Sequence, residues 1–281
     1  MNWCSASGAP TTRPFRPSPN ATAGASRLMP PCVYWRAMAR VRFLDEAGRI
    51  RTGEMSGSDV RFGDRTYEAA SVEILPPVEP TKVVATGRNY REHIEEGDPD
   101  AAPPEIPRLF FKTPNTVVGH DTTITIPEGK TVEPEVELGV VVGTECRDVA
   151  AADAMDVVDG FTCLNDLSNR DDQFGTERTG RRDYVRGKAF DNSCPLGPAV
   201  VPPEEVPDDA TLRARVNGET VQRASRDAMI FTIPEIIESI TQYITLEPGD
   251  VIATGTCEGP VPVSDGDRVT IEIEGIGTLE N

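Results

Sequence analysis

Two glutamates that alternate along one predicted strand are the sharpest chemical feature of the sequence. Glu135 and Glu137 are two residues apart and run directly into the apolar stretch 138–142. Residues two apart in a strand point to the same face, so both carboxylates are predicted to lie at the mouth of a buried strand. Like charges that close repel unless a cation sits between them, and hard cations such as Mg²⁺ or Mn²⁺ take carboxylate oxygens. Asp166, which follows the apolar run 161–164, is the best candidate for a third ligand.

A solvated edge strand is the competing interpretation of this alternation. In a protein rich in Glu, the pattern Glu-x-Glu is often the wet face of an edge strand, and spacing alone favours that interpretation. A soft-metal site is favoured even less, because no His or Cys is near these carboxylates in the sequence.

Histidine is scarce, and only His93 and His120 occur in the chain. His93 and Glu96 share one face of a helix predicted over residues 89–96, so they could form an imidazole–carboxylate pair. That pair could act as a general base whose ring is oriented by Glu96. An ordinary surface pair has the same spacing, and without further information it is the favoured interpretation.

Other polar residues could assist a metal site. Lys188 could neutralise negative charge that develops on a substrate, although most lysines are solvated surface charges. Arg170 and Gln173 follow Asp166 closely and could fix a substrate carboxylate, Arg170 through a two-pronged contact. Nothing beside Cys194 or Cys257 indicates an activated thiolate, so small core or lining residues are expected there.

Composition narrows the class of partner. The 281 residues include 46 acidic and 28 basic side chains, a formal net charge of -18. Such a surface repels phosphate backbones and anionic lipids, so neither nucleic acid nor a membrane is an expected partner. The six cysteines form no C-x-x-C pair, which fits a reducing cytoplasm. No apolar run approaches the roughly 18 residues of a membrane-spanning helix.

The elements that must position these residues are mostly strands, and the predicted fold class is mostly β with α (α+β). Residues 1–37 lack acidic side chains and apolar periodicity, and are predicted to be a disordered or spurious extension. Residues 38–78 are predicted to form a small β-rich module, and 79–281 a larger domain. Further helices are predicted over 150–158 and from Pro234, and a hairpin turn at Asn217-Gly218.

Several motifs in a fixed order resemble the fumarylacetoacetate hydrolase family, and the likeness covers nearly everything from Lys82 to Asn281. No single motif is decisive, but the ordered set is very specific and strongly favours the metal interpretation. The matching segments are 87–93 (GRNYREH), 110–112 (FFK), 135–138 (EVEL), 165–171 (NDLSNRD), 187–191 (GKAFD), 194–198 (CPLGP), 246–250 (LEPGD), 254–256 (TGT) and 273–279 (IEGIGTL).

The resemblance implies a β-rich fold of the family's own type, usually in a homodimer. It implies one Mg²⁺ or Mn²⁺ per subunit, bound by Glu135, Glu137 and Asp166. It also implies that His93 and Glu96 are the catalytic pair, carried on a helical lid. The positions implied to face the substrate are Lys112, Arg170, Gln173, Lys188 and Thr256.

The family's chemistry implies a small 2-oxo acid as substrate. Hydrolysis of an acylpyruvate is the first expectation, in line with the acylpyruvase and 2-hydroxyhepta-2,4-diene-1,7-dioate isomerase branch. Isomerisation, tautomerisation or decarboxylation of a dicarboxylic 2-oxo acid such as oxaloacetate is the next, and a catalytically silent metal-binding member is the third. The carboxylates and the dyad occur together, which favours an enzyme. Cys257 replaces the Pro of the family's usual Thr-Gly-Thr-Pro and Asn169 stands where Ala is common, and both departures leave the substrate open.

Overall fold

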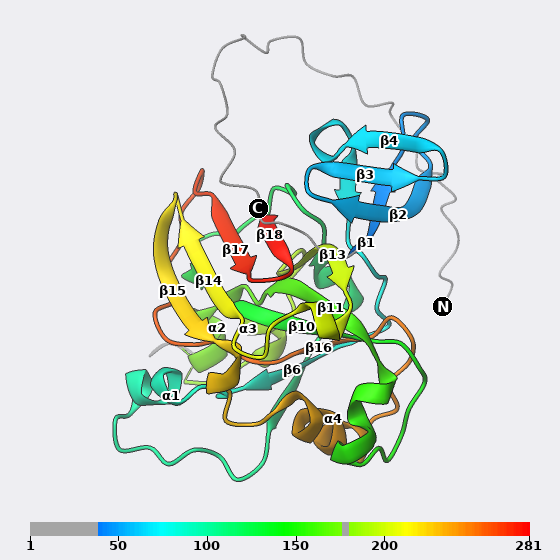
Figure 1. Cartoon of the computed structure of the whole chain (residues 1–281). Coiled ribbons are helices and arrows are strands. Elements are labelled where there is room, and N and C mark those ends of the chain that lie inside the picture. Colours follow the sequence, from blue (N-terminus) through cyan, green and yellow to red (C-terminus); the bar gives the residue numbers. More distant parts are fainter. Residues whose placement is uncertain (1–38, 176–179) are drawn as a thin grey trace, which may run out of the picture. The chain divides into compact units, whose positions relative to one another are not determined.

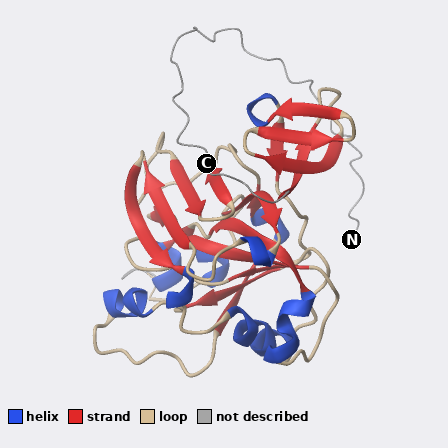
Figure 2. Ribbon diagram, in the orientation of Figure 1, coloured by secondary structure: helices blue, strands red, loops and turns tan. Residues whose placement is uncertain are grey.

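The computed structural model describes residues 39–175 and 180–281 (Figure 1). The predicted extension at 1–37 lies outside these described residues. Strands make up most of the regular structure and helices are few and short (Figure 2), which confirms the predicted fold class.

The strand that contains Glu137 lies at the centre of the main part of the fold. β10 (Val136–Val142) is buried at every position and pairs with a neighbour on both sides, as expected for a run of apolar residues without alternation. This part of the large sheet has the order β13 (Cys194–Val201), β11 (Val158–Asn165), β10, β16 (Val251–Ala253), β6 (Val83–Gly87) and β7 (Arg108–Lys112). The short strand β8 (Val117–Val118) pairs with β13.

The predicted N-terminal module is a set of short antiparallel strands. It contains β1 (Ala39–Leu44), β2 (Ile50–Ser56), β3 (Asp59–Phe62), β4 (Arg65–Glu68) and β5 (Glu73–Leu75), with a 3-10 turn, η1, at Ala69–Ser71. β1 also meets β13 at Arg40 and Val200, so the module's strands continue the large sheet. The division into separate domains at residue 78 stays a prediction.

A second sheet has the strand order β15 (Glu219–Ser225), β14 (Thr211–Val216), β17 (Val269–Ile273) and β18 (Gly277–Glu280). The predicted turn joins β14 to β15, with Val216 paired to Glu219. Asn217 and Gly218 have φ of 53° and 87°, the left-handed values that a two-residue hairpin turn requires. A third, two-stranded sheet pairs β9 (Val132–Glu133) with β12 (Ser168–Asn169).

The helices agree in part with prediction. α1 (Arg91–Gly97) begins two residues later than expected, and the segment expected at 150–158 is a 3-10 helix, η3 (Ala151–Val157), a form suited to short connections. The helices α2 (Arg170–Phe174) and α3 (Tyr184–Lys188) were not predicted, because five residues are too few to show apolar periodicity. The remaining 3-10 turns are η2 (Pro114–Thr116), η4 (Pro203–Glu205) and η5 (Arg226–Ala228). Within the described ranges, no helix combines the length and the apolar character needed to cross a bilayer.

α4 (Ile233–Thr241) starts one residue before Pro234 and buries Ile236, Ile237 and Ile240, as predicted. Its N-terminus has a complete capping box: the Thr232 hydroxyl accepts from Glu235 N, and the Glu235 carboxylate accepts from Thr232 N.

Thr232→Ala removes this cap and should therefore lower the free energy of unfolding by about 1 kcal/mol. Urea unfolding measures this, and Ser239→Ala in the middle of the same helix is the control, expected to cause no loss.

Candidate active site

Strand pairing brings the three predicted metal ligands together. Glu135 immediately precedes β10, Glu137 lies within it, and Asp166 immediately follows β11. The two strands are paired in register, and Asp166 N donates to Glu135 O at 3.0 Å. One carboxylate oxygen from each residue lies within 4.8 Å of the others, and all three residues are buried. An edge strand is excluded, because β10 is flanked on both sides.

Two buried lysines compensate part of this negative charge. Lys188 Nζ donates to Glu135 Oε2 at 2.7 Å and to Asp166 Oδ2 at 2.6 Å. Lys112 Nζ donates to Asp166 Oδ1 at 2.6 Å and also to the backbone oxygen of Lys188. Burial lowers the pKa of Lys188, but Asp166 and Glu135 outweigh it, so the net pKa is raised and the ammonium stays charged.

Arg170 forms ion pairs with two glutamates of the site. Its guanidinium bridges Glu133 Oε2 at 2.6 Å and Glu135 Oε1 at 2.7 Å, and a third contact reaches Gln173 Oε1 at 2.8 Å. Burial acts to raise the pKa of Glu135, yet Lys188 and Arg170 outweigh it and the net pKa is lowered. Glu135 is therefore fully ionised at neutral pH.

Glu137 is in a different electrostatic position. Its Oε2 accepts from Gly255 N at 2.7 Å, and no Lys or Arg of the described chain forms an ion pair with it. Burial raises its pKa well above the ordinary value, and the neighbouring charges of Asp166 and Glu135 raise it further. Gly255 has φ of 97°, and a Cβ there would lie 2.7 Å from Asn89 Cβ, so glycine is needed for this approach.

The donor set fits a hard divalent cation. All the candidate ligand atoms are carboxylate oxygens, which Mg²⁺ and Mn²⁺ prefer, and no soft donor belongs to the group. A cation there would also supply the positive charge that Glu137 lacks. Glu135, Glu137 and Asp166 are the residues that would hold it.

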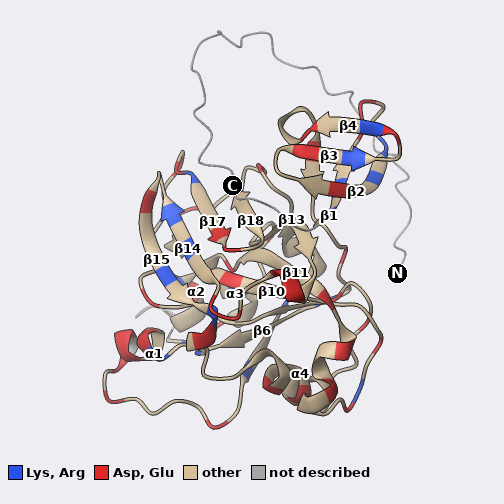
Figure 3. Ribbon diagram, in the orientation of Figure 1, with Lys and Arg blue, Asp and Glu red and all other residues tan. Residues whose placement is uncertain are grey.

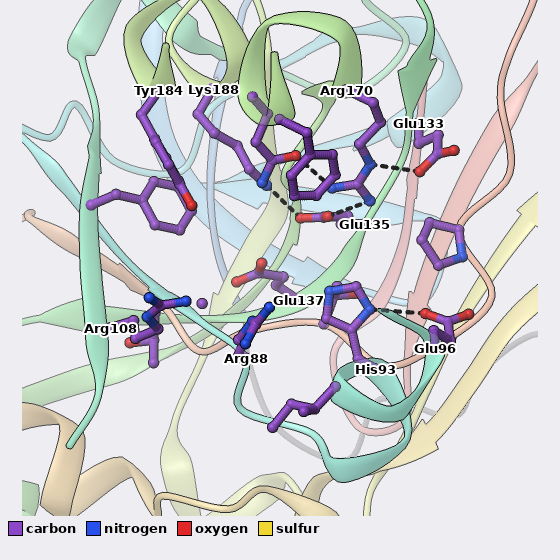
Figure 4. A pocket seen from close by; sticks show the side chains of 18 of the residues that line it. Arg88, His93, Glu96, Arg108, Glu133, Glu135, Glu137, Arg170, Tyr184 and Lys188 are labelled. Atoms are coloured by element: carbon purple, nitrogen blue, oxygen red, sulfur yellow. Dashed lines mark hydrogen bonds and ion pairs between the residues drawn. The ribbon is translucent and has the colours of Figure 1, made fainter. Parts of the chain in front are cut away.

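The predicted imidazole–carboxylate pair faces the same cavity as Glu135 and Glu137. His93 Nδ1 lies 3.0 Å from Glu96 Oε2, and Glu96 Oε1 accepts from Gly259 N at 2.6 Å. Figure 4 shows the His93 ring between Glu96 and the carboxylates of Glu135 and Glu137. The bond from Gly259 fixes Glu96, and Glu96 in turn orients the ring.

A cavity of about 620 Å³ is lined by His93, Glu96, Glu135 and Glu137. Arg170, Gln173, Lys188 and Thr256 also line it, as their predicted roles require. Lys112 is fully buried and bonds Asp166, outside the cavity lining, and its part in substrate binding stays a prediction. Several other residues that line the cavity have no role predicted from the sequence, namely Arg88, Arg108, Phe110, Glu133, Arg182 and Tyr184. Glu133 could have been found, because it continues the alternation of Glu135 and Glu137.

The buried cysteines should be chemically inert. Burial is the main cause that raises the pKa of both Cys194 and Cys257 to about 12. At pH 8 only roughly one thiol in ten thousand is then ionised. Iodoacetamide followed by peptide mapping should leave both cysteines unmodified in folded protein and modify both in urea. Rapid labelling of Cys257 in folded protein would contradict this account.

A buried carboxylate triad beside an oriented imidazole is an arrangement that can hold a divalent cation next to an acid–base group. The chain belongs to the fumarylacetoacetate hydrolase family. Residues 82–281 match the family described as fumarylacetoacetate (FAA) hydrolase C-terminal, the same span over which the sequence resembles the family.

Named relatives carry out different reactions. The chain is 41% identical over 223 residues to the mitochondrial oxaloacetate tautomerase FAHD2A of Bos taurus, covering 75% of this chain and 69% of that protein. The 2-hydroxyhepta-2,4-diene-1,7-dioate isomerase from Mycobacterium marinum has a TM-score of 0.74 at 34% identity, covering 87% of this chain and 97% of the other. Maleylpyruvate hydrolase from Sphingobium sp. SYK-6, solved with manganese (II) ion and pyruvate, has a TM-score of 0.71 at 28% identity, covering 86% and 98%.

Proposed function

We propose that this protein is a divalent-metal-dependent tautomerase of small 2-oxo acids. The observation that carries the proposal is that Glu135, Glu137 and the His93–Glu96 pair line one cavity, with the buried Asp166 carboxylate within 4.8 Å of both glutamates. A divalent cation on the triad would polarise the 2-oxo and 1-carboxylate oxygens of the acid and stabilise its enolate. The chain's own residues then need only to hold the acid and move a proton.

His93 is the proton carrier in this proposal. Because Nδ1 faces Glu96, the other ring nitrogen, Nε2, is the one that is free to face the substrate. In the keto-to-enol direction the C3–H bond breaks and its proton passes to Nε2, while the enol oxygen takes a proton from solvent. In the opposite direction the imidazolium returns a proton to C3, with the Glu96 carboxylate stabilising the charged ring. Lys188 supplies positive charge beside the enolate.

We favour tautomerisation over hydrolysis of an acylpyruvate, which is the first expectation from the sequence. The relative named as an oxaloacetate tautomerase is 41% identical, whereas the structure named as a maleylpyruvate hydrolase is 28% identical. Hydrolysis of a longer acylpyruvate is the second candidate, because a cavity of about 620 Å³ has room for more than a four-carbon acid. It would need the same pair to activate a water molecule.

The test follows two products with Mg²⁺- or Mn²⁺-loaded protein. Loss of ultraviolet absorbance of enol-oxaloacetate reports tautomerisation, and coupled pyruvate detection reports cleavage of acylpyruvates. We expect acceleration of the first reaction above its spontaneous rate and no acceleration in protein stripped with EDTA. Pyruvate release without enol conversion would favour hydrolysis, and activity that survives EDTA would contradict the metal-dependent proposal.

We also propose that the protein is a homodimer and that it is located in the cytoplasm. Sedimentation equilibrium tests the dimer, and a monomer at micromolar concentration would overturn that part.

A further inference from the structure

Two arginines of the cavity lie apart from the carboxylate cluster. Arg88 and Arg108 both line the cavity that holds Glu135, Glu137 and His93. Figure 4 shows them on the Glu137 side, away from Arg170 and Lys188 in this view. We propose that Arg88 and Arg108 form a subsite for the second carboxylate of a dicarboxylic 2-oxo acid. This inference rests on the proposed function and specifies the substrate class.

The backbone fixes both arginines at one edge of the large sheet. Gly87, the last residue of β6, is paired with Arg108, the first residue of β7, so Arg88 follows directly beside its partner strand. Arg88 has φ of 60°, a left-handed conformation that is uncommon for a residue with a Cβ. Residues held in such conformations cluster at ligand sites, where the surroundings over-determine them.

Neither guanidinium is neutralised by an acid in the parts of the chain that the structure describes. Arg170, on the same cavity, contacts both Glu133 and Glu135. No ion pair to Arg88 or Arg108 is found among residues 39–175 and 180–281, in a protein with 46 acidic side chains. Asp and Glu residues colour much of α1 red in Figure 3, and α1 begins at Arg91, three residues after Arg88. Both side chains are exposed, and two arginines without an acidic partner on the wall of this cavity suit an anionic ligand.

The ligand's two ends can be assigned from the charges. The 2-oxo and 1-carboxylate oxygens belong at the triad, where the cation would bind them. Arg170 is already shared between two glutamates, so it offers little unused capacity for a second anionic group. Within residues 39–175 and 180–281 no side-chain hydrogen bond or ion pair occupies Arg88 or Arg108, and a guanidinium binds a carboxylate through two parallel N–H···O bonds. The distal end of the acid should therefore carry a carboxylate.

The experiment compares pairs of acids that differ only at that end. Oxaloacetate is paired with 2-oxobutanoate, and 2-oxoglutarate with 2-oxopentanoate, because each pair exchanges a terminal carboxylate for a methyl group. Isothermal titration calorimetry on Mg²⁺-loaded protein measures binding, with each acid first brought to its keto–enol equilibrium so that no net conversion adds to the heat. The variants are Arg88→Gln, Arg108→Gln and their combination. Arg91→Gln on α1 is the control, because Arg91 is an exposed arginine outside the cavity lining and its loss changes the net charge equally.

Wild type should bind at least one dicarboxylic acid about tenfold or more tightly than its methyl counterpart. Each single variant should reduce that preference by several fold, and the double variant should remove it. The dissociation constants of the methyl acids should stay within about twofold of wild type in all variants. The dissociation constants of every acid should stay within the same range in Arg91→Gln. Equal binding within both pairs, or a preference that survives in the double variant, would overturn the subsite.

The outcome separates this inference from the proposed function. Conversion of enol-oxaloacetate by a wild type without a dicarboxylate preference overturns the subsite alone. A preference that depends on both arginines, in a protein that converts no enol, supports the subsite and overturns the tautomerase proposal.

Discussion

Glu137→Gln should lower Mn²⁺ affinity by at least about a hundredfold, since even the loss of an outer-shell partner costs 10–100-fold. The change keeps the side chain's shape and removes only its charge. In wild type, Glu137 is the member of the triad with no cationic side chain beside it, so its charge is the one that a bound cation would compensate most directly. Mn²⁺ electron paramagnetic resonance titration measures the affinity. Glu145→Gln is the matched control, because Glu145 is exposed and its side chain forms no hydrogen bond or ion pair within residues 39–175 and 180–281.

The same substitution should change how metal-free stability depends on pH. The pKa of Glu137 is raised well above its ordinary value of 4.5 by burial, then by Asp166 and Glu135. A carboxyl group with a raised folded-state pKa stabilises the fold fully below its unfolded pKa, and this contribution is lost as pH rises through the folded value. Metal-free wild type should therefore lose stability as pH rises above about 4.5, the unperturbed value. Glu137→Gln should lack this component, and Mn²⁺ should restore stability at neutral pH only in wild type.

Thermal unfolding between pH 5 and 8, with and without Mn²⁺, measures this behaviour. Equal stabilisation of wild type and Glu137→Gln by Mn²⁺ would place the cation elsewhere. A metal-free wild type whose stability is unchanged over this range, relative to the variant, would contradict the electrostatic description of Glu137.

His93→Asn should slow enol conversion by about 10²–10⁴-fold, the usual contribution of a positioned general acid–base group. Mn²⁺ affinity should stay within about twofold of wild type, because His93 belongs to α1 and not to the carboxylate triad. The ultraviolet enol assay and the Mn²⁺ titration on the same samples measure both quantities.

A matched pair on the same helix serves as control. Glu96→Gln removes the carboxylate that orients His93 at 3.0 Å, and should reduce the rate less than His93→Asn does. Glu95→Gln makes the same chemical change one residue away, where the contact is a 3.8 Å surface pair with Arg91, and should have no effect. A rate for His93→Asn close to wild type would remove His93 from the mechanism.

The sequence predicts which residues lie together at the centre of the candidate site, because the geometry there is mostly local. Alternation places Glu135 and Glu137 on one face of a strand, and helical spacing places His93 beside Glu96. Asp166 was a weaker inference from the residues alone, because its position depends on the pairing of β10 with β11. The ordered family motifs supplied that long-range information.

The periphery of the site could not be predicted, because it depends on contacts between distant segments. Arg88 and Arg108 line one cavity because β6 pairs with β7 in a register that puts Gly87 opposite Arg108. The helices α2 and α3 are too short to leave a periodic pattern, although they carry Arg170, Gln173 and Lys188. The burial of Lys112 against Asp166 likewise follows from packing across 54 positions of the chain.

Hydrogen–deuterium exchange at C3 of a 2-oxo acid tests the central claim most directly. Initial exchange rates for oxaloacetate in D₂O are followed by NMR with wild type and His93→Asn, each with Mg²⁺ and after EDTA. We predict exchange above the uncatalysed rate only when wild-type His93 and Mg²⁺ are both present. Exchange by wild type that persists without metal, or by His93→Asn at the wild-type rate, would contradict a mechanism in which the triad's cation and His93 act together.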